Sequence, residues 1–318
     1  MQLVRQKEKR TAKRGRSGTV ALVALLGAAL ASGCGQGSPG AGHHSRQGAA
    51  GAGGRAAAGA APQAAPVSAL LSYAERLKRR QAQRVAVARK WGLADVPLAA
   101  PAPPAEKPRI TSREGFEVDD GEDLPQVFTT VPTDERIVFL TIDDGAEKDP
   151  QFLRMMDELK IPYSAFLSDY LASEDYGYFA RMQEKGVTLN NHTLTHPYLP
   201  GLSYAQQKKE ICDQQDRIEK HFGKRPVLLR PPYGNYNRDT LVVAKSCGIK
   251  AVPLWAEEAF PDHMDWREWD RDLHPGDIVL THFQGREQWK GTMTDMVRNV
   301  MKVITDKGYA VARLEDYV

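Results

Sequence analysis

Short apolar runs alternate with helical patterns of apolar residues along residues 110–318. The apolar runs predict seven strands, at residues 137–142, 163–167, 187–189, 227–229, 251–254, 278–280 and 310–311. The helical patterns predict five helices, at residues 150–159, 176–184, 204–222, 238–247 and 292–306. Repeated alternation of strands and helices is typical of a parallel sheet with helical crossovers. Seven strands of this kind predict an α/β fold that forms a closed or nearly closed barrel.

The N-terminal arm, residues 1–109, has a different composition from the rest of the chain. Ala, Gly, Pro and Arg dominate it, and it carries too few large apolar side chains to form a core. We interpret it as four segments: a signal peptide (1–33), a Gly/Ala-rich flexible tether (34–66), a basic helix (67–92) and a Pro/Ala linker (93–109). Residues 110–318 are then the single folded domain, preceded by a disordered or helical arm.

The start of the chain resembles an export signal. A basic segment, residues 1–17, precedes an apolar stretch at 20–31 that is too short to span a bilayer. The stretch ends in Leu-Ala-Ser-Gly-Cys (30–34), which is similar to the lipobox of bacterial lipoproteins. This resemblance implies a lipid on Cys34, and so a protein on the outer face of the cytoplasmic membrane. Ala31 departs from the lipobox pattern, so ordinary signal cleavage, giving a secreted or cell-wall protein, stays open.

The charge of the chain is divided unevenly. Residues 109–318 carry 26 Lys and Arg against 36 Asp and Glu, a net charge of −10, whereas the whole chain has a formal net charge of +3. The excess of positive charge therefore belongs to the arm. An acidic folded domain argues against a nucleic-acid partner, which favours a basic face. The basic helix suits an anionic lipid or wall polymer, and a solvated spacer helix is the alternative.

Polar residues follow the ends of several predicted strands. In a parallel α/β barrel, the C-terminal ends of the strands meet at one face, where active sites are found. Segments far apart in the sequence are therefore expected to share one pocket. The residues concerned are Asp143, Asp144, His192, His196, Arg230 and His282.

The motif TIDDG (141–145) leads from an apolar strand directly into two carboxylates. Adjacent carboxylates repel each other unless a cation lies nearby. Gly145 lets the chain turn sharply there. A solvated turn is the alternative interpretation of this motif taken alone.

The motif NHTLTHP (191–197) holds two histidines four residues apart. Imidazole suits zinc and similar ions, and two His with one carboxylate leave coordination positions open for catalysis. A lone histidine pair is more often structural. Together with a strand-end aspartate it favours a metal site.

Two further segments complete the pattern. In LRPPYG (229–234), two prolines stiffen the chain, and Arg230 is suited to hold a carboxylate. In GDIVLTH (276–282), His282 stands at the end of a strand. Each residue also has a structural interpretation. For Arg230 it is an arginine that closes the mouth of the barrel, and for His282 it is a histidine whose polar groups are satisfied by hydrogen bonds.

In order, placement and spacing, these four segments resemble the polysaccharide deacetylase family, which is carbohydrate esterase family four, over about residues 136–318. The resemblance implies a distorted seven-stranded (β/α) barrel and a divalent metal, Zn²⁺ or Co²⁺. It implies that Asp143 is the general base and that Asp144, His192 and His196 bind the metal. Arg230 would orient Asp143.

The resemblance also assigns residues around the substrate. The backbone N–H of Tyr233 would hold the oxyanion and help to bind the substrate. His282 would be the general acid, and Leu280 would line the acetyl pocket. The acidic partner of His282 is assigned to Asp265, with Trp266 beside it in contact with the substrate.

The sequence departs from the family pattern in three places. Ile142 replaces a Phe and Ala146 replaces a Pro. The fourth motif, two acids and a Trp, has no clear counterpart. Three other acids are alternatives to Asp265 as the partner of His282: Glu257, Glu258 and Asp262.

The resemblance implies an enzyme that removes acetyl groups from a carbohydrate, with N-acetyl groups of cell-wall sugars as the first expectation. Peptidoglycan or chitin-like substrates, a membrane attachment, and a monomer are expected. A metal-dependent amidase acting on a non-sugar amide is one alternative, and a non-catalytic wall-binding lipoprotein is another. A serine hydrolase is disfavoured because the chain has no Gly-x-Ser-x-Gly motif.

Cys212 and Cys247 lie on predicted helix faces beside apolar residues. Buried free thiols are the favoured interpretation. Export would permit a disulfide, and that alternative stays open.

Overall fold

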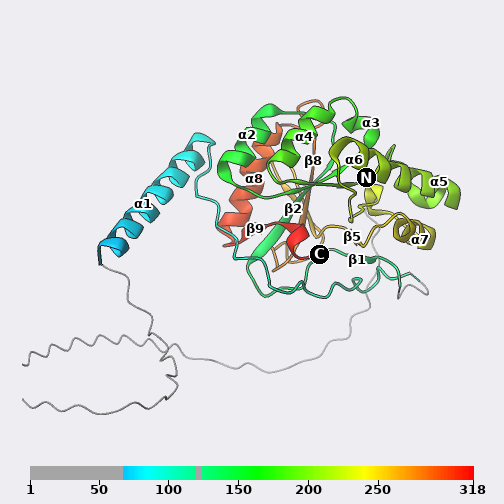
Figure 1. Cartoon of the computed structure of the whole chain (residues 1–318), viewed down its shortest axis with the longest axis horizontal. Helices are drawn as coiled ribbons and strands as arrows, with labels where there is room; N and C mark the ends of the chain where they lie inside the picture. Colours follow the sequence, from blue (N-terminus) through cyan, green and yellow to red (C-terminus); the bar gives the residue numbers. More distant parts are fainter. Residues whose placement is uncertain (1–66, 119–122) are drawn as a thin grey trace, which may run out of the picture. The chain divides into compact units, whose positions relative to one another are not determined.

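The computed structural model describes residues 67–118 and 123–318 (Figure 1). The predicted signal peptide, Cys34 and the predicted tether lie outside the described residues. Helix α1 occupies Val67–Lys90. At its C-terminal end, Ala88 and Trp91 are buried in the same hydrophobic cluster as the central strands. No helix within the described part of the chain is both long and apolar enough to cross a membrane.

Strand β2 is the centre of the main sheet (Figure 1). Its apolar run is buried along almost its whole length, as expected for a parallel strand covered on both faces. The sheet has the order β4-β3-β2-β8-β6-β7, with β9 also paired to β2. All the pairings are parallel except the one between β6 and the edge strand β7. The strands are β2 (Ile137–Asp144), β3 (Ser164–Leu167), β4 (Thr188–Asn191), β6 (Glu257–Ala259), β7 (Met264–Trp266), β8 (Ile278–His282) and β9 (Ala310–Ala312).

A second, two-stranded parallel sheet joins β1 (Gln126–Phe128) to β5 (Ala251–Pro253). The α/β class is confirmed, whereas the described residues form two sheets and no closed barrel of paired strands. The expected strand at 227–229 makes only single bridges, from Leu228 to β5 and from Leu229 to β4. Prolines lie immediately before and shortly after this segment, and they lack the N–H groups that a regular ladder needs.

Helices connect the strands. The helix bounds predicted at 150–159 and 176–184 agree with the structure, and the segment at 204–222 is one helical run that contains a π-helical turn, η2. The helices after α1 are α2 (Pro150–Leu159), α3 (Asp169–Ala172), α4 (Tyr176–Glu184), α5 (Tyr204–Lys208), η2 (Lys209–Asp213), α6 (Gln214–Phe222), α7 (Arg238–Ser246) and α8 (Met293–Asp306). Short 3₁₀ turns are η1 (Leu199–Gly201), η3 (Pro232–Gly234) and η4 (Leu314–Asp316).

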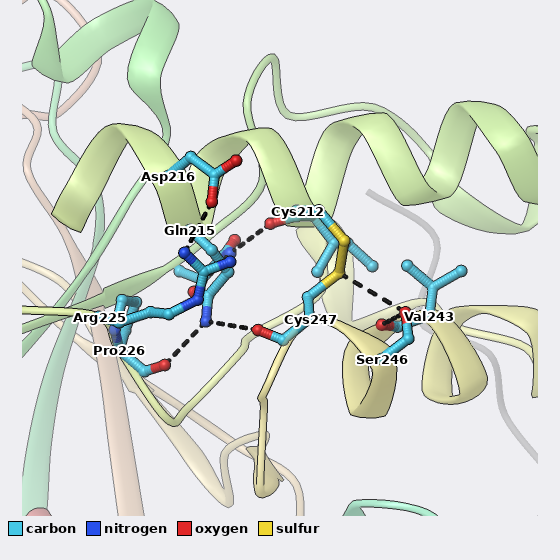
Figure 2. Close-up of a disulfide and its surroundings, with 10 residues drawn as sticks. Cys212, Gln215, Asp216, Arg225, Pro226, Val243, Ser246 and Cys247 are labelled. Carbon is cyan, nitrogen blue, oxygen red and sulfur yellow. Dashed lines mark hydrogen bonds and ion pairs between the residues drawn. A yellow bond between two sulfur atoms is a disulfide. The ribbon is translucent and has the colours of Figure 1, made fainter. Parts of the chain in front are cut away.

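A disulfide links Cys212 to Cys247 (Figure 2). The prediction of two free thiols is therefore wrong. The bond joins the π-helical turn η2 to Cys247, the C-cap residue of α7, and these elements pack together. Their Cα atoms are 5.2 Å apart, within the usual range for a disulfide. Sequence spacing could not give this distance, because the two cysteines are 35 residues apart and the distance depends on how η2 and α7 pack.

Candidate active site

The two neighbouring aspartates at the end of β2 have different surroundings. Asp143 is buried, and its backbone pairs with His282 of β8. Asp144 has φ 80° and Gly145 has φ 105°, so the chain turns through the left-handed region at this point. A Cβ on Gly145 would lie 3.1 Å from the ring of Phe179, so a larger residue would also crowd this ring.

Asp144, His192 and His196 come together in one cluster. Their potential ligand atoms all lie within 4.8 Å of one another. The Nε2 atoms of His192 and His196 are each 3.4 Å from Oδ1 of Asp144. This Oδ1 is buried and has no hydrogen-bond partner, which is costly unless a cation or a proton satisfies it. Two imidazoles and one carboxylate suit a borderline divalent ion such as zinc, so the residues fit a metal.

The ring of His192 is oriented by the loop after Leu229. Its Nδ1 is 2.7 Å from the backbone carbonyl of Arg230. An Nδ1–H that donates to a carbonyl leaves Nε2 unprotonated and free to bind a metal. The loop that carries Arg230 therefore contributes to the histidine cluster as well as to Asp143.

Backbone strain is concentrated in these loops. Among the described residues other than glycine, six have a left-handed φ, and four of them belong to the site. These four are Asp144 (80°), Thr193 (68°), His196 (59°) and Tyr233 (60°). Such conformations persist only where surrounding contacts enforce them, and they are common at functional sites.

The charges of the cluster shift the pKa values of its members. Burial raises the pKa of Asp144, but the close imidazole of His192 and the nearby His282 and His196 lower it more, to about 2. Burial lowers the pKa of His192, yet the carboxylates of Asp143 and Asp144 raise it more, and the net shift is upward. Burial and the charge of His192 lower the pKa of His196. The Asp144 carboxyl is therefore ionised at neutral pH, as a metal ligand must be.

Arg230 is fully buried and holds Asp143. Its Nη1 donates to Asp143 Oδ1 at 2.8 Å and to the hydroxyl of Thr141 at 2.8 Å. Its Nε and Nη2 donate to the carbonyls of Pro253 and Leu254, at 2.9 and 3.2 Å. Because these partners all lie in the strands or at their ends, the guanidinium is rigid, and it fixes one oxygen of Asp143.

His282 faces Glu258, one of the three acids that the sequence offers as alternatives to Asp265. Nδ1 of His282 is 3.3 Å from Oε1 of Glu258 in the neighbouring strand β6. The assignment of Asp265 as the partner of His282 is wrong, because Asp265 lies one strand further away, in the edge strand β7. There its side chain is 61% exposed, and its Oδ1 is 3.9 Å from Nε2 of His263.

Trp266 also differs from the expectation. It packs on the hydrophobic core and has the ammonium of Lys307 5.6 Å from its ring centroid. Successive residues of a strand point to opposite faces, so Trp266 and its neighbour Asp265 cannot both face one site.

Tyr233 lies beside His196, and Leu280 lies in the same strand as His282. Tyr233 is 62% exposed, and the centroid of its ring is 4.7 Å from that of His196. Leu280 is buried, two residues before His282 and thus on the same face of β8. Tyr170 was not expected near the site from the sequence. It is half exposed, and its pKa is raised first by burial and then by the charge of Asp144.

Known proteins resemble this chain over the same region. Residues 130–252 match the family model for polysaccharide deacetylase. An uncharacterised protein of Streptomyces coelicolor is 38% identical over 218 residues, which are 68% of this chain and 87% of that protein. A peptidoglycan-N-acetylmuramic acid deacetylase of Bacillus subtilis is 30% identical over 198 residues, which are 59% of this chain and 40% of that protein.

A solved structure shares the fold. It is that of a carbohydrate esterase family 4 pseudoenzyme from Bacillus anthracis, with a TM-score of 0.52 and 20% identity, covering 61% of this chain and 69% of that chain. At this identity the likeness shows the fold alone. The family model and the relative with 38% identity together show that this chain belongs to the polysaccharide deacetylase family.

Proposed function

We propose that this protein is a metal-dependent hydrolase that removes N-acetyl groups from sugars of the cell wall. The observation that carries the proposal is the cluster of Asp144, His192 and His196 beside a second aspartate, Asp143, which Arg230 holds at 2.8 Å. A site that only binds metal needs no such second carboxylate. Curated relatives named as peptidoglycan deacetylases and chitooligosaccharide deacetylases support a carbohydrate substrate.

Asp144, His192 and His196 would hold the metal, and Zn²⁺ is the proposed ion, with Co²⁺ as the alternative. When bound, a divalent cation supplies Lewis-acid polarisation of the acetyl carbonyl and makes water more acidic.

The other residues of the site have separate roles in the proposed reaction. Asp143, with Oδ1 held by Arg230, accepts the proton of the attacking water. The backbone N–H of Tyr233 donates to the oxyanion, a contribution that is typically about 10²–10³ in rate. His282, with Nδ1 toward Glu258, protonates the leaving amine, and Leu280 lines the acetyl pocket.

Two alternatives remain distinct from this proposal. A metal-dependent amidase would use the same residues on a non-sugar amide. A non-catalytic wall-binding protein would need neither Asp143 nor His282. The Arg230–Asp143 pair and the His282–Glu258 pair favour catalysis over binding, because both act on groups that do not ligate the metal.

We also propose that the protein is exported and anchored by a lipid on Cys34, as a monomer. The support is the basic and apolar segments that precede Cys34 in the sequence. Mass spectrometry of the mature N-terminus tests this. An unmodified terminus beyond Cys34 would remove the anchor and leave secretion.

The decisive assay is acetate release from peptidoglycan, chitin oligomers and acetylxylan, with chelated protein reloaded with Zn²⁺ or Co²⁺. The proposal predicts metal-dependent release from peptidoglycan. Release from a small amide alone would favour the amidase. No release from any substrate by protein shown to hold metal would favour the binding protein.

A further inference from the structure

The two metal-site histidines belong to a loop, residues 191–196, that lies against the π-helical turn η2. A single glutamate of this turn accepts three hydrogen bonds from the loop. The Leu194 N–H donates to the backbone carbonyl of Glu210 at 3.0 Å. The Thr195 N–H donates to Oε2 of Glu210 at 2.8 Å, and the Thr195 hydroxyl donates to Oε1 at 2.8 Å. Both carboxylate oxygens are therefore used on the residue immediately before His196.

The same helical segment also holds the start of the loop. Asn191 Nδ2 donates to the carbonyl of Ile211 at 2.9 Å and to Oε1 of Gln215 at 3.0 Å. Its Oδ1 accepts from the Thr193 N–H at 2.8 Å. Residues 210–215 thus hold the loop at Asn191 and again at Leu194 and Thr195. His192 lies between these two points, and His196 directly follows the second.

This loop needs external support because its backbone is strained. Thr193 and His196 have φ values of 68° and 59°, a region that side chains with a Cβ disfavour. The turn that supports it is itself unusual, since single π-helical turns inside α-helices are rare and occur frequently at functional sites. Charge-assisted bonds such as those to a carboxylate are the stronger kind of hydrogen bond.

The π-helical turn η2 is itself held by contacts with the rest of the fold. The Cys212–Cys247 disulfide attaches it to the end of α7 (Figure 2). Nε2 of Gln215 donates to the carbonyls of Pro226 and Cys247, at 2.8 and 3.3 Å (Figure 2). The support under the histidine loop is therefore rigid.

We propose that Glu210 is a positioning residue of the metal site, which holds His196 in its ligating position by gripping Thr195. This inference rests on the proposed metal-dependent function. Glu210 itself binds no metal in this scheme, because both its carboxylate oxygens accept from Thr195. Its effect should therefore appear as weakened metal affinity in a protein that still folds.

The test is the Zn²⁺ affinity of the full chain, measured by competition with a chelating dye, together with the thermal midpoint of the metal-free protein. Glu210→Ala should weaken Zn²⁺ binding by about 10- to 100-fold, as removal of groups behind metal ligands typically does. Glu210→Gln keeps one acceptor oxygen and should recover part of the affinity. Glu184→Ala, at an exposed glutamate of α4, is the matched control and should bind as wild type.

The possible outcomes distinguish failure of the proposed metal-dependent function from failure of the positioning role of Glu210. If the wild-type chain binds no Zn²⁺, the proposed metal function fails. If the wild-type chain binds Zn²⁺ and Glu210→Ala binds it equally well, the positioning role is overturned. If affinity falls only together with the thermal midpoint of the metal-free protein, in both Glu210 variants, Glu210 is merely structural and the proposal is also overturned.

Discussion

Nη1 of Arg230 donates to Oδ1 of Asp143 at 2.8 Å, and both side chains are buried. The same guanidinium nitrogen also donates to Thr141, and the other two nitrogens donate to backbone carbonyls. A lysine carries the same charge but cannot reproduce this planar set of donors. The pair therefore fixes the direction of Asp143 as well as its charge.

Arg230→Lys should lower kcat for acetate release by about 100-fold, the effect expected when a reacting group is misplaced by about 1 Å. Bound metal should remain, because Arg230 contacts His192 only through its backbone carbonyl. Steady-state kinetics and metal content check this. Arg225→Lys, at an exposed ion pair, is the control and should be near wild type. Equal activity of the two variants would contradict the positioning of Asp143 by Arg230.

Asp143→Asn and Asp144→Asn should separate catalysis from metal binding. Loss of a general base typically costs about 10²–10⁴ in rate, so Asp143→Asn should lose most acetate release and keep its metal. Asp144→Asn should bind metal weakly and recover part of its activity in excess metal. Metal content and acetate release are measured for both. A variant Asp143→Asn that loses metal while Asp144→Asn keeps it would reverse the two assignments.

The contact between His282 and Glu258 predicts which acid supports the histidine. Glu258→Gln removes the charge that faces His282 Nδ1, so kcat should fall by about tenfold or more, the size typical for groups that orient a functional histidine. Asp265→Asn should be close to wild type. The comparison is made on one substrate with both variants fully loaded with metal. Equal losses would restore Asp265 as a partner.

Glu257 predicts a pH dependence of stability. This residue is 1% exposed, and burial, followed by the charge and hydrogen bond of Asp277, raises its pKa from 4.5 to about 10. Between these values the folded protein holds a proton that the unfolded chain releases. Stability should therefore fall as pH rises from about 4.5 toward 10, by at most about 1.4 kcal/mol per pH unit from this group.

The side chain introduced by Glu257→Gln is neutral at every pH, so this variant does not lose stability in this way as the pH rises. The stability of the variant relative to wild type should therefore increase from pH 5 to pH 7 and to pH 9, as measured by urea unfolding. A constant difference across this range would show that Glu257 is not the group responsible.

The disulfide predicts a large contribution to stability. It closes a loop of 35 residues, for which the chain-entropy estimate is about 4 kcal/mol. The double variant Cys212→Ser/Cys247→Ser should lose about 2–4 kcal/mol of unfolding free energy, since measured effects are often smaller than this estimate. Denaturant unfolding of the metal-free chain measures it. A loss below about 0.5 kcal/mol would mean that packing between η2 and α7 alone holds these helices.

Local sequence patterns are sufficient to predict the features that depend on residues close together in the chain. Helices α2 and α4 have the predicted bounds because an aspartate caps each N-terminus and an apolar stripe continues along each helix. The apolar run of β2 ends at two aspartates, and the two histidines follow β4. Parallel strands bring their C-terminal ends to one face, so the cluster of Asp144, His192 and His196 follows from these local patterns.

Features that depend on which elements are neighbours in space could not be predicted before the fold was known. Glu258 faces His282 because β6 lies between β8 and β7, an order that no local pattern encodes. Cys212 and Cys247 are bonded because η2 packs on the end of α7. Glu210 accepts hydrogen bonds from the histidine loop, and it does so from a π-helical turn. The sequence predicts one continuous helix there. In each case the deciding contact joins residues distant in sequence, and its geometry is set by packing rather than by periodicity.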